Sequence, residues 1–186
     1  MNAANRLTIL RILLVPVFIA SLIYFTPERP YFYSIAVIVY LVACFTDALD
    51  GYLAKKLNQK TQLGSYIDPI ADKLLLLSGY LSLSLIDHLP VSMHMPGWVT
   101  LFVISRDVVI LIGSVIIFIA TGALKAAPLF IGKLTTVMQM TALLASLLAL
   151  PQETRTVLYF LTAALTVVSG ILYIRIGGKI LQDGAA

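Results

Sequence analysis

Long apolar runs separated by short polar segments make up most of the chain. A helix needs about 20 residues to cross the hydrocarbon core of a bilayer, and six of the apolar runs are close to or above that length. The pattern therefore predicts an all-α integral membrane protein, a bundle of six transmembrane helices that forms a single domain over residues 1–186. The predicted helices cover residues 7–25, 32–54, 66–86, 98–122, 132–150 and 155–175.

The composition agrees with a membrane protein. Of the 186 residues, 60% are hydrophobic and 12% are charged, and the mean hydropathy is +0.96. These values exclude a water-soluble domain of this size. Cys44 is the only cysteine, so neither an intramolecular disulfide nor a thiolate metal cluster is expected.

The positions of Lys and Arg predict the orientation, because these residues are enriched on the cytoplasmic side of membrane proteins. With both termini in the cytoplasm, nine basic residues lie on that side and two, Arg29 and Arg155, lie on the other. The excess of basic residues then faces anionic lipid headgroups and anionic substrates, and it gives no reason to expect nucleic acid as a partner. The nine are Arg6, Arg11, Lys55, Lys56, Lys60, Lys125, Lys133, Arg175 and Lys179.

Four aspartates, Asp47, Asp50, Asp68 and Asp72, interrupt the apolar pattern of the second and third predicted helices. Carboxylates in membrane segments are costly, so a cluster of them indicates a functional site. At 100° per residue, the first two share a face near the cytoplasmic end of the second helix, and the last two share a face at the start of the third. The short connection makes these helices antiparallel neighbours, so we expect the four carboxylates to converge beside the cytoplasmic interface.

Four carboxylates at close range do not all stay ionised unless cations neutralise them. Oxygen ligands select hard ions, and we expect two divalent cations, Mg²⁺ or Mn²⁺. Such a pair suits displacement at phosphorus, and a carboxylate partly free of metal would accept a proton from an attacking hydroxyl. The small residues Gly51, Ala54 and Gly64 leave room for a nucleotide beside the backbone.

The spacing of these residues resembles the signature of the CDP-alcohol phosphatidyltransferase family, and in this chain it reads Asp47-x2-Asp50-Gly51-x2-Ala54-x9-Gly64-x3-Asp68-x3-Asp72. The likeness extends over most of the chain, since the runs NAANRLTILR, PGWVTLFVISRDV and FIGKLTTVMQM resemble the family's N-terminal segment, fourth helix and fifth helix. Where the family commonly has Arg after the alanine, this chain has Lys55. Lysine keeps the charge and lacks the planar fork that binds phosphate in bidentate fashion.

The resemblance implies an enzyme with six spans that transfers the phosphatidyl group of CDP-diacylglycerol to an alcohol and releases CMP. It implies that metals on the four aspartates bridge the diphosphate, that Asp72 is the general base for the acceptor hydroxyl, and that the protein is a homodimer. By the same likeness, the nucleotide-binding residues are Asn2, Asn5, Thr8, Arg11, Gly51, Ala54, Lys55 and Gly64.

The fourth and fifth predicted helices carry the residues that bear on the acceptor. Arg106 lies well inside a span and has to face a polar cavity or a partner, and Lys133 lies at the cytoplasmic start of the fifth helix. These two residues are predicted to bind an anionic acceptor. Asp107 is adjacent to Arg106, and adjacent helix residues are not expected to face each other. A purely structural network between helices explains Arg106 and Asp107 equally well.

Two glycerol-type acceptors are compatible with the fourth helix. Relatives that make phosphatidylglycerophosphate commonly have Ala-Arg-Glu and a second Arg eight residues later, where this chain has Ser105-Arg106-Asp107 and Ser114. The run Ile-Ser-Arg-Asp-Val is more similar to cardiolipin synthases of the CMP-forming type, whose acceptor phosphatidylglycerol carries a single negative charge. Glycerol 3-phosphate is the commoner acceptor in this branch and is placed first, with phosphatidylglycerol as the alternative.

Simpler explanations exist for parts of the site. The aspartates could form buried pairs with nearby Lys or Arg side chains, although the convergence of four favours metal ligands. Asn5, Thr8 and Arg11 lie where helix capping and anchoring at the cytoplasmic interface also explain them.

A cation channel or transporter is the alternative from another class of function. Transport favours acidic residues spread across the membrane depth, and broken helices or repeats near its midplane. Here the four signature aspartates lie towards one side, and the chain has no convincing internal repeat. A structural protein without chemistry would leave the aspartates unexplained, so the enzyme is favoured.

Overall fold

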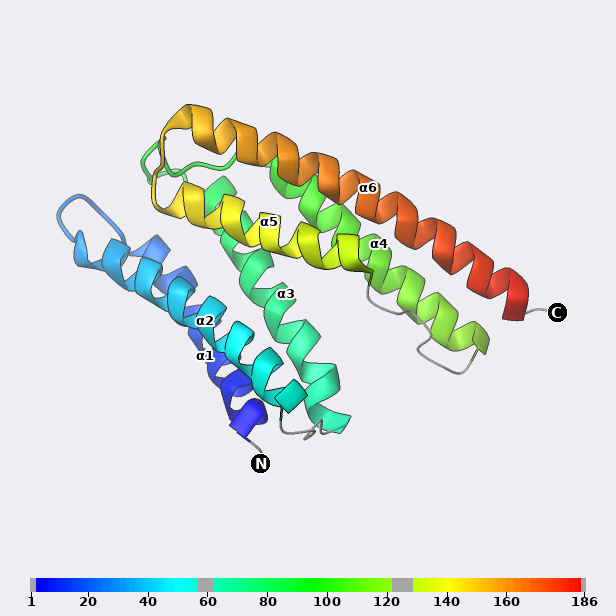
Figure 1. Ribbon diagram of the computed structural model, residues 1–186. Helices are drawn as coiled ribbons and strands as arrows, with labels where there is room; N and C mark the ends of the chain where they lie inside the picture. The colour runs from blue at the N-terminus through cyan, green and yellow to red at the C-terminus, as the bar shows by residue number, and fades with distance from the viewer. Residues whose placement is uncertain (1–2, 57–61, 122–128, 185–186) are drawn as a thin grey trace. The chain divides into compact units, whose positions relative to one another are not determined.

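The computed structural model describes residues 3–56, 62–121 and 129–184 and is all-α in these ranges (Figure 1). Side chains are described outside residues 3–6, 48–72, 121 and 183–184. The helices are α1 (Ala3–Ile23), α2 (Tyr31–Lys56), α3 (Gln62–Leu85), α4 (Gly97–Thr121), α5 (Phe130–Leu147) and α6 (Gln152–Gly184).

Each helix coincides with one predicted from the apolar runs, and most boundaries agree within a few residues. The largest difference is at the end of α6, which reaches Gly184 where the prediction ended at residue 175. Arg175 and Lys179 end the apolar run, but charged residues do not by themselves end a helix. The hydropathy pattern therefore located the apolar span of α6 but underestimated the length of the helix.

The length and apolar character of the helices indicate an integral membrane protein. Within the described residues, the segments Gly97–Ala120, Phe130–Leu147 and Gln152–Gln182 are long and apolar enough to cross a bilayer. The apolar segments Leu7–Ile23 and Tyr31–Asp47, and also Lys73–Leu85, are shorter. The predicted count of six spans therefore stays a prediction.

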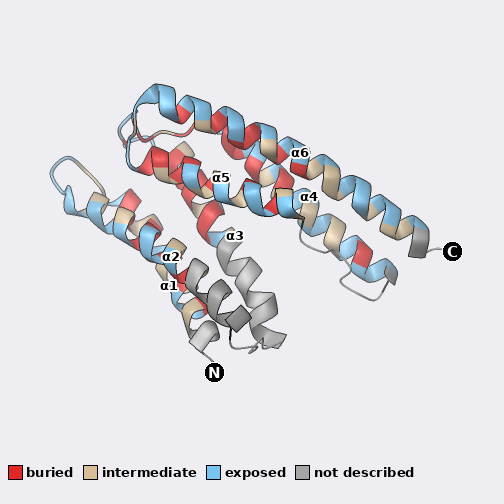
Figure 2. Ribbon diagram, viewed as in Figure 1, coloured by how far each residue is buried: buried red, intermediate tan, exposed pale blue. Residues whose placement is uncertain are grey.

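Many residues of α4 and α6 are exposed (Figure 2), and large apolar residues are among them. Leu111 is 64% exposed, Ile119 is 77% exposed and Phe160 is 62% exposed. Such a surface is unfavourable in water and is expected where helices face lipid chains. It therefore agrees with the membrane assignment.

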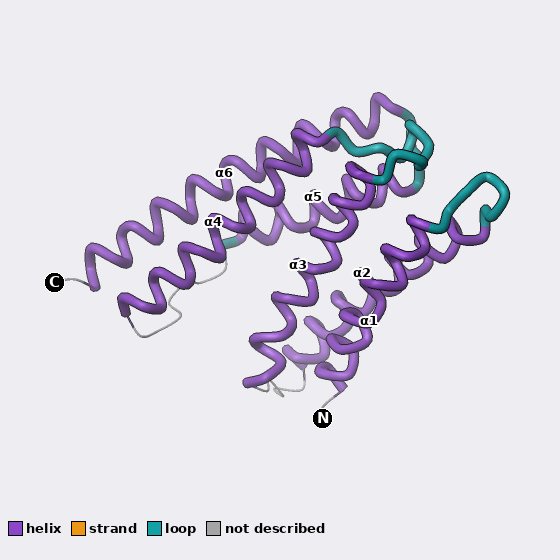
Figure 3. Tube along the Cα trace, turned by 180° about the vertical axis from the view of Figure 1, so that it is seen from behind, coloured by secondary structure: helices purple, strands orange, loops and turns teal. Residues whose placement is uncertain are grey.

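The chain divides into two compact units, Met1–His94 and Met95–Ala186. In the first unit, α1 packs against both α2 and α3, and the turn of residues 24–30 makes α1 and α2 antiparallel (Figures 1 and 3). Large apolar side chains such as Phe18 and Tyr40 are buried there, with ring centroids 5.9 Å apart. The first unit thus places α1 beside the two helices that carry the four aspartates.

In the second unit, α6 packs against both α4 and α5, and Figures 1 and 3 show it running alongside them. Small and hydroxyl-bearing residues line the contact between α5 and α6. Thr135 donates a hydrogen bond to the carbonyl of Leu165 at 3.3 Å, and the hydroxyl oxygens of Ser146 and Tyr159 lie 2.6 Å apart. Close packing and interhelical hydrogen bonds of this kind stabilise helix pairs in membranes.

Prolines and a tight turn set where the helices of this unit begin. Pro96 and Pro151 directly precede α4 and α6, as is common because their missing N–H groups would have no intrahelical partner. Between α5 and α6, Ala149 adopts φ 50°, and the N–H of Leu150 bonds to the carbonyl of Ala145 at 3.0 Å. This closes α5 and returns the chain for α6.

Candidate functional site

The helix boundaries agree with the predicted placement of the four aspartates. Asp47 and Asp50 lie on α2, and Asp68 and Asp72 lie on α3. Among the four, the structure describes the side chain of Asp47 alone. The expected convergence of the carboxylates therefore lies outside the described side chains. The same holds for the predicted nucleotide-binding residues Asn2, Asn5, Gly51, Ala54, Lys55 and Gly64.

An ion pair between α1 and α2 joins two of the predicted site residues. The Nη1 atom of Arg11 lies 3.3 Å from Oδ1 of Asp47, and the exposed fractions of the two side chains are 0% and 29%. Thr8, one turn earlier on α1, is also buried. A side chain that only anchored the helix at the interface would reach water, so the burial of Arg11 favours a role inside the protein.

The carboxylate of Asp47 has the chemistry of a ligand for a hard cation. A carboxylate offers about four lone-pair positions, and the Asp47 side chain is partly exposed beside Arg11. Within the part of the chain whose side chains are described, no three His, Cys, Asp or Glu side chains come together. Three of the four candidate ligands lie outside that part, and the oxygen donors of the set fit Mg²⁺ or Mn²⁺.

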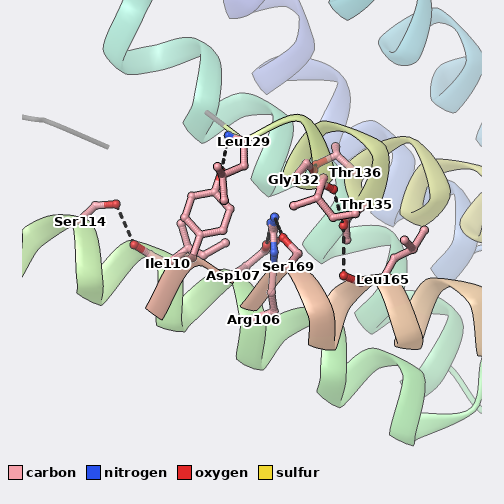
Figure 4. A network of polar contacts seen from close by, with 12 residues as sticks. Arg106, Asp107, Ile110, Ser114, Leu129, Gly132, Thr135, Thr136, Leu165 and Ser169 are labelled. Atoms are coloured by element: carbon pink, nitrogen blue, oxygen red, sulfur yellow. Dashed lines mark hydrogen bonds and ion pairs between the residues drawn. The ribbon is translucent and has the colours of Figure 1, made fainter. Parts of the chain in front are cut away.

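A second group of polar side chains surrounds Arg106 in the unit of α4, α5 and α6 (Figure 4). Arg106 is 7% exposed, its Nη1 donates to Oδ1 of Asp107 at 2.8 Å, and its Nη2 donates to Oγ of Ser169 at 2.9 Å. The centre of the guanidinium lies 5.6 Å from the centroid of the Tyr173 ring. Arg106 is therefore fixed between α4 and α6.

The expectation that Arg106 and Asp107 do not face each other is wrong. The spacing rule describes the directions of Cβ atoms around a helix. The long arginine side chain bends back and carries the guanidinium to the neighbouring carboxylate. The predicted structural network between helices is present as well, through Ser169.

Gly132 lets the first turn of α5 approach this cluster closely. A Cβ atom on Gly132 would lie 2.9 Å from the hydroxyl oxygen of Tyr173 and 3.3 Å from Nη2 of Arg106. The Tyr173 hydroxyl accepts a hydrogen bond from the backbone N–H of Leu129 at 3.3 Å. Lys133 follows Gly132, and its side chain is exposed. The structure thus buries one of the two predicted acceptor-binding cations and exposes the other.

One donor of Arg106 is unused. Its Nε atom is buried and has no hydrogen-bond partner among the residues that the structure describes. A buried charged donor without an acceptor is costly, and an oxygen of an anionic ligand would satisfy it. The cluster therefore has one donor to offer to an anionic group.

Sequence reasoning missed Ser169, Tyr173 and Gly132. Gly132 directly precedes Lys133, which was already a candidate, so a glycine at the start of an apolar helix was an available signal. Nothing in the spacing along α6 indicates that Ser169 and Tyr173 face Arg106, because that depends on how α6 is rotated against α4.

The Arg11–Asp47 contact predicts thermodynamic coupling between the two side chains. Asp47→Ala should lower the Tm of the protein in detergent by several degrees, because it removes the carboxylate that pairs with the buried guanidinium of Arg11. Adding Arg11→Leu should recover part of that loss, since coupling within an ion pair is about 0.5–3 kcal/mol. Asp87→Ala, at an exposed loop carboxylate, is the control. Strictly additive losses in the double variant would contradict the contact.

Comparisons with known proteins agree with the signature and extend beyond it. The sequence model of the CDP-alcohol phosphatidyltransferase family matches residues 1–168. A probable phosphatidylglycerophosphate synthase of Mycobacterium tuberculosis is 33% identical over 176 residues, which cover 93% of this chain and 80% of that protein. A CDP-diacylglycerol--glycerol-3-phosphate 3-phosphatidyltransferase of Pseudomonas fluorescens is 40% identical over 113 residues, or 59% of this chain and 53% of that protein.

A CMP-forming cardiolipin synthase of Homo sapiens is 32% identical over 203 residues, which cover 96% of this chain and 62% of that protein. The family match spans both compact units of the chain. The chain therefore belongs to the CDP-alcohol phosphatidyltransferase family, enzymes that transfer a substituted phosphate group.

Proposed function

We propose that this enzyme moves the phosphatidyl group of CDP-diacylglycerol onto a hydroxyl of a glycerol-type acceptor and releases CMP. The observation that carries the proposal is the buried guanidinium of Arg106, a fixed cation for an anionic acceptor inside an apolar helix bundle. The relative from Pseudomonas fluorescens is named for transfer to glycerol 3-phosphate. Glycerol 3-phosphate is therefore the first candidate acceptor.

The donor would be bound by residues of the first unit. We assign the metal ligands to Asp47, Asp50, Asp68 and Asp72, whose oxygen donors suit two divalent cations, Mg²⁺ or Mn²⁺. When bound, such cations neutralise the diphosphate and stabilise the leaving group. The nucleotide-binding residues, assigned by likeness to the family, are Asn5, Thr8, Arg11, Gly51, Ala54, Lys55 and Gly64.

The chemical step is a displacement at the phosphorus of the phosphatidyl group. Asp72 would accept the proton of the acceptor hydroxyl as general base. The acceptor oxygen then forms the new bond to phosphorus, and the bond from phosphorus to the CMP oxygen breaks. The electron pair of the broken bond leaves with CMP.

The acceptor would be bound by residues of the second unit. Arg106 is held by Asp107 and Ser169, so its direction is set before the acceptor arrives, which lowers the entropic cost of binding. Lys133 is exposed at the first turn of α5, where a flexible ammonium suits recruitment of an anion more than rigid recognition.

Phosphatidylglycerol is the second candidate acceptor, and two features of α4 favour it. Ser114 stands where a second arginine would suit a doubly charged phosphate, and its hydroxyl donates to the carbonyl of Ile110 at 2.8 Å. The charge of Arg106 is offset by Asp107 at 2.8 Å. A guanidinium already paired with a carboxylate suits the singly charged phosphodiester of phosphatidylglycerol better than the phosphate of glycerol 3-phosphate.

We further propose that the chain forms one domain, with both termini and the active site at the cytoplasmic face, and that it acts as a homodimer. The asymmetric distribution of Lys and Arg supports the orientation. Likeness to the family supports the dimer.

The proposed function predicts metal-dependent release of CMP. Purified protein in detergent should release CMP from CDP-diacylglycerol when Mg²⁺ or Mn²⁺ is present together with glycerol 3-phosphate or phosphatidylglycerol, and chelation with EDTA should abolish it. Identification of the lipid product decides between the two acceptors. Absence of CMP with both acceptors would reject the proposed function.

Asp72→Asn should reduce turnover at least 100-fold, because general-base catalysis contributes about 10²–10⁴-fold. Binding of CDP-diacylglycerol should change little, because the other three aspartates would still supply metal ligands. The measurement is kcat beside the Kd of the donor, obtained by titration. Equal losses in kcat and in donor affinity would place Asp72 among the essential ligands instead.

Arg106→Ala should raise the acceptor KM by about 10–100-fold, since hydrogen bonds to charged groups are worth about 1.5–3 kcal/mol. The same variant should change the KM of CDP-diacylglycerol much less. Arg106→Lys should recover little, because an ammonium does not reproduce the fork that spans Asp107 and Ser169. Lys133→Ala, at an exposed cation, should have the smaller effect. An unchanged acceptor KM in Arg106→Ala would remove Arg106 from the acceptor site.

A further inference from the structure

Tyr173 of α6 holds the first turn of α5. Its hydroxyl oxygen accepts a hydrogen bond from the N–H of Leu129 at 3.3 Å. Leu129 is the N-cap residue of α5, and its own side chain makes no capping hydrogen bond. Helix N-termini leave backbone N–H groups without intrahelical partners, so a hydroxyl from another helix serves there as a cap. Tyr173 thereby fixes the start of the helix that carries Lys133.

Tyr173 also adjoins the buried cation. The guanidinium centre of Arg106 lies 5.6 Å from the centroid of the Tyr173 ring, a distance at which a cation is attracted to a ring face. The Nε–H of Arg106 has no acceptor among the described residues. The Tyr173 oxygen accepts from Leu129, and a hydroxyl that accepts one hydrogen bond still has its own O–H to donate.

Gly132 shows how closely the hydroxyl is held against α5. If Gly132 carried a Cβ atom, the nearest atom to it would be the Tyr173 hydroxyl oxygen, at 2.9 Å. Cβ atoms in proteins essentially never lie this close to a non-bonded atom. Arg106 Nη2 would be 3.3 Å from the same Cβ. Glycine at this position therefore permits the hydroxyl, the guanidinium and the backbone of the first turn of α5 to adjoin one another.

We propose that Tyr173 is a further acceptor-binding residue, whose hydroxyl donates a hydrogen bond to an oxygen of the acceptor's phosphate group. The same anion would accept from Nε of Arg106 and from N–H groups of the first turn of α5, because a helix N-terminus and a buried arginine both favour negative charge. This inference rests on the proposed function, and it concerns the phosphate group that glycerol 3-phosphate and phosphatidylglycerol share.

Tyr173→Phe tests the proposal, because it removes the hydroxyl and keeps the ring beside Arg106. The acceptor KM should rise about tenfold, corresponding to one hydrogen bond to a charged group, while kcat and the KM of CDP-diacylglycerol stay within about twofold. Tyr159→Phe is the matched control, since the Tyr159 hydroxyl on the same helix bonds to Ser146. It should lower the Tm and leave the acceptor KM unchanged. An unchanged acceptor KM in Tyr173→Phe, or an equal rise in the Tyr159 control, would overturn the proposal.

A binding measurement separates this inference from the proposed function. Inorganic phosphate is titrated calorimetrically into the full-length protein with EDTA and without CDP-diacylglycerol. Wild-type protein should bind phosphate, and Tyr173→Phe should weaken binding by about tenfold. If this difference is found but no acceptor supports CMP release, the proposed function fails and the anion site stands. If CMP release is normal but phosphate binds both proteins equally, the anion site fails alone.

Gly132→Ala provides a second test that does not depend on the phenylalanine variant. The added methyl group should displace the Tyr173 hydroxyl and raise the acceptor KM, because the contact of 2.9 Å leaves no room for it. In the double variant with Tyr173→Phe, the two effects should be far from additive, since the hydroxyl that the methyl group displaces is already absent. Additive effects on the acceptor KM would contradict the proposed role of the hydroxyl.

Discussion

Buried positive charge is the constraint that organises both units of the chain, because a cation among apolar helices has to be paired. In the first unit, Arg11 is fully buried on α1 and pairs with Asp47 on α2. In the second, Arg106 on α4 is bound by Asp107 and by Ser169 of α6. Each arginine thereby ties the helix that carries it to a neighbour, at a residue that the sequence had already marked for binding a substrate.

The pairing in the second unit depends on close approach of the helices. Lipid chains are as apolar as leucine side chains, so helices in a membrane associate through tight packing and hydrogen bonds more than through hydrophobic burial. Gly132 provides the close approach beside Tyr173, and Thr135 bonds across to the carbonyl of Leu165. The first turn of α5 is therefore positioned by contacts with α6, which also carries partners of Arg106.

The sequence predicted the helices well, because the thickness of the bilayer sets the length of an apolar run. It also identified Arg106 as a residue that needed a polar partner, and the hydroxyl of Ser169 is one. The expectation that Asp107 does not face Arg106 was wrong. The spacing rule follows the directions of Cβ atoms, and the arginine side chain is long enough to bend back to its neighbour. The sequence could not find Tyr173, since no pattern within one helix encodes the rotation of α6 against α4. The convergence of Asp47 with Asp50, Asp68 and Asp72 stays a prediction.

The charge balance around Arg106 bears on how the acceptor is recognised. Because Asp107 lies 2.8 Å from Nη1, its carboxylate offsets part of the positive charge that Arg106 presents to an anion. In the proposed acceptor site, recognition would depend on directed donors such as the buried Nε of Arg106. Such donors select the shape of a phosphate ester more than its total charge. A doubly charged phosphate would need a further cation, and Lys133 is the exposed candidate on α5. In the proposed site, Arg106 would bind either acceptor, and recruitment of the doubly charged one would depend more on Lys133.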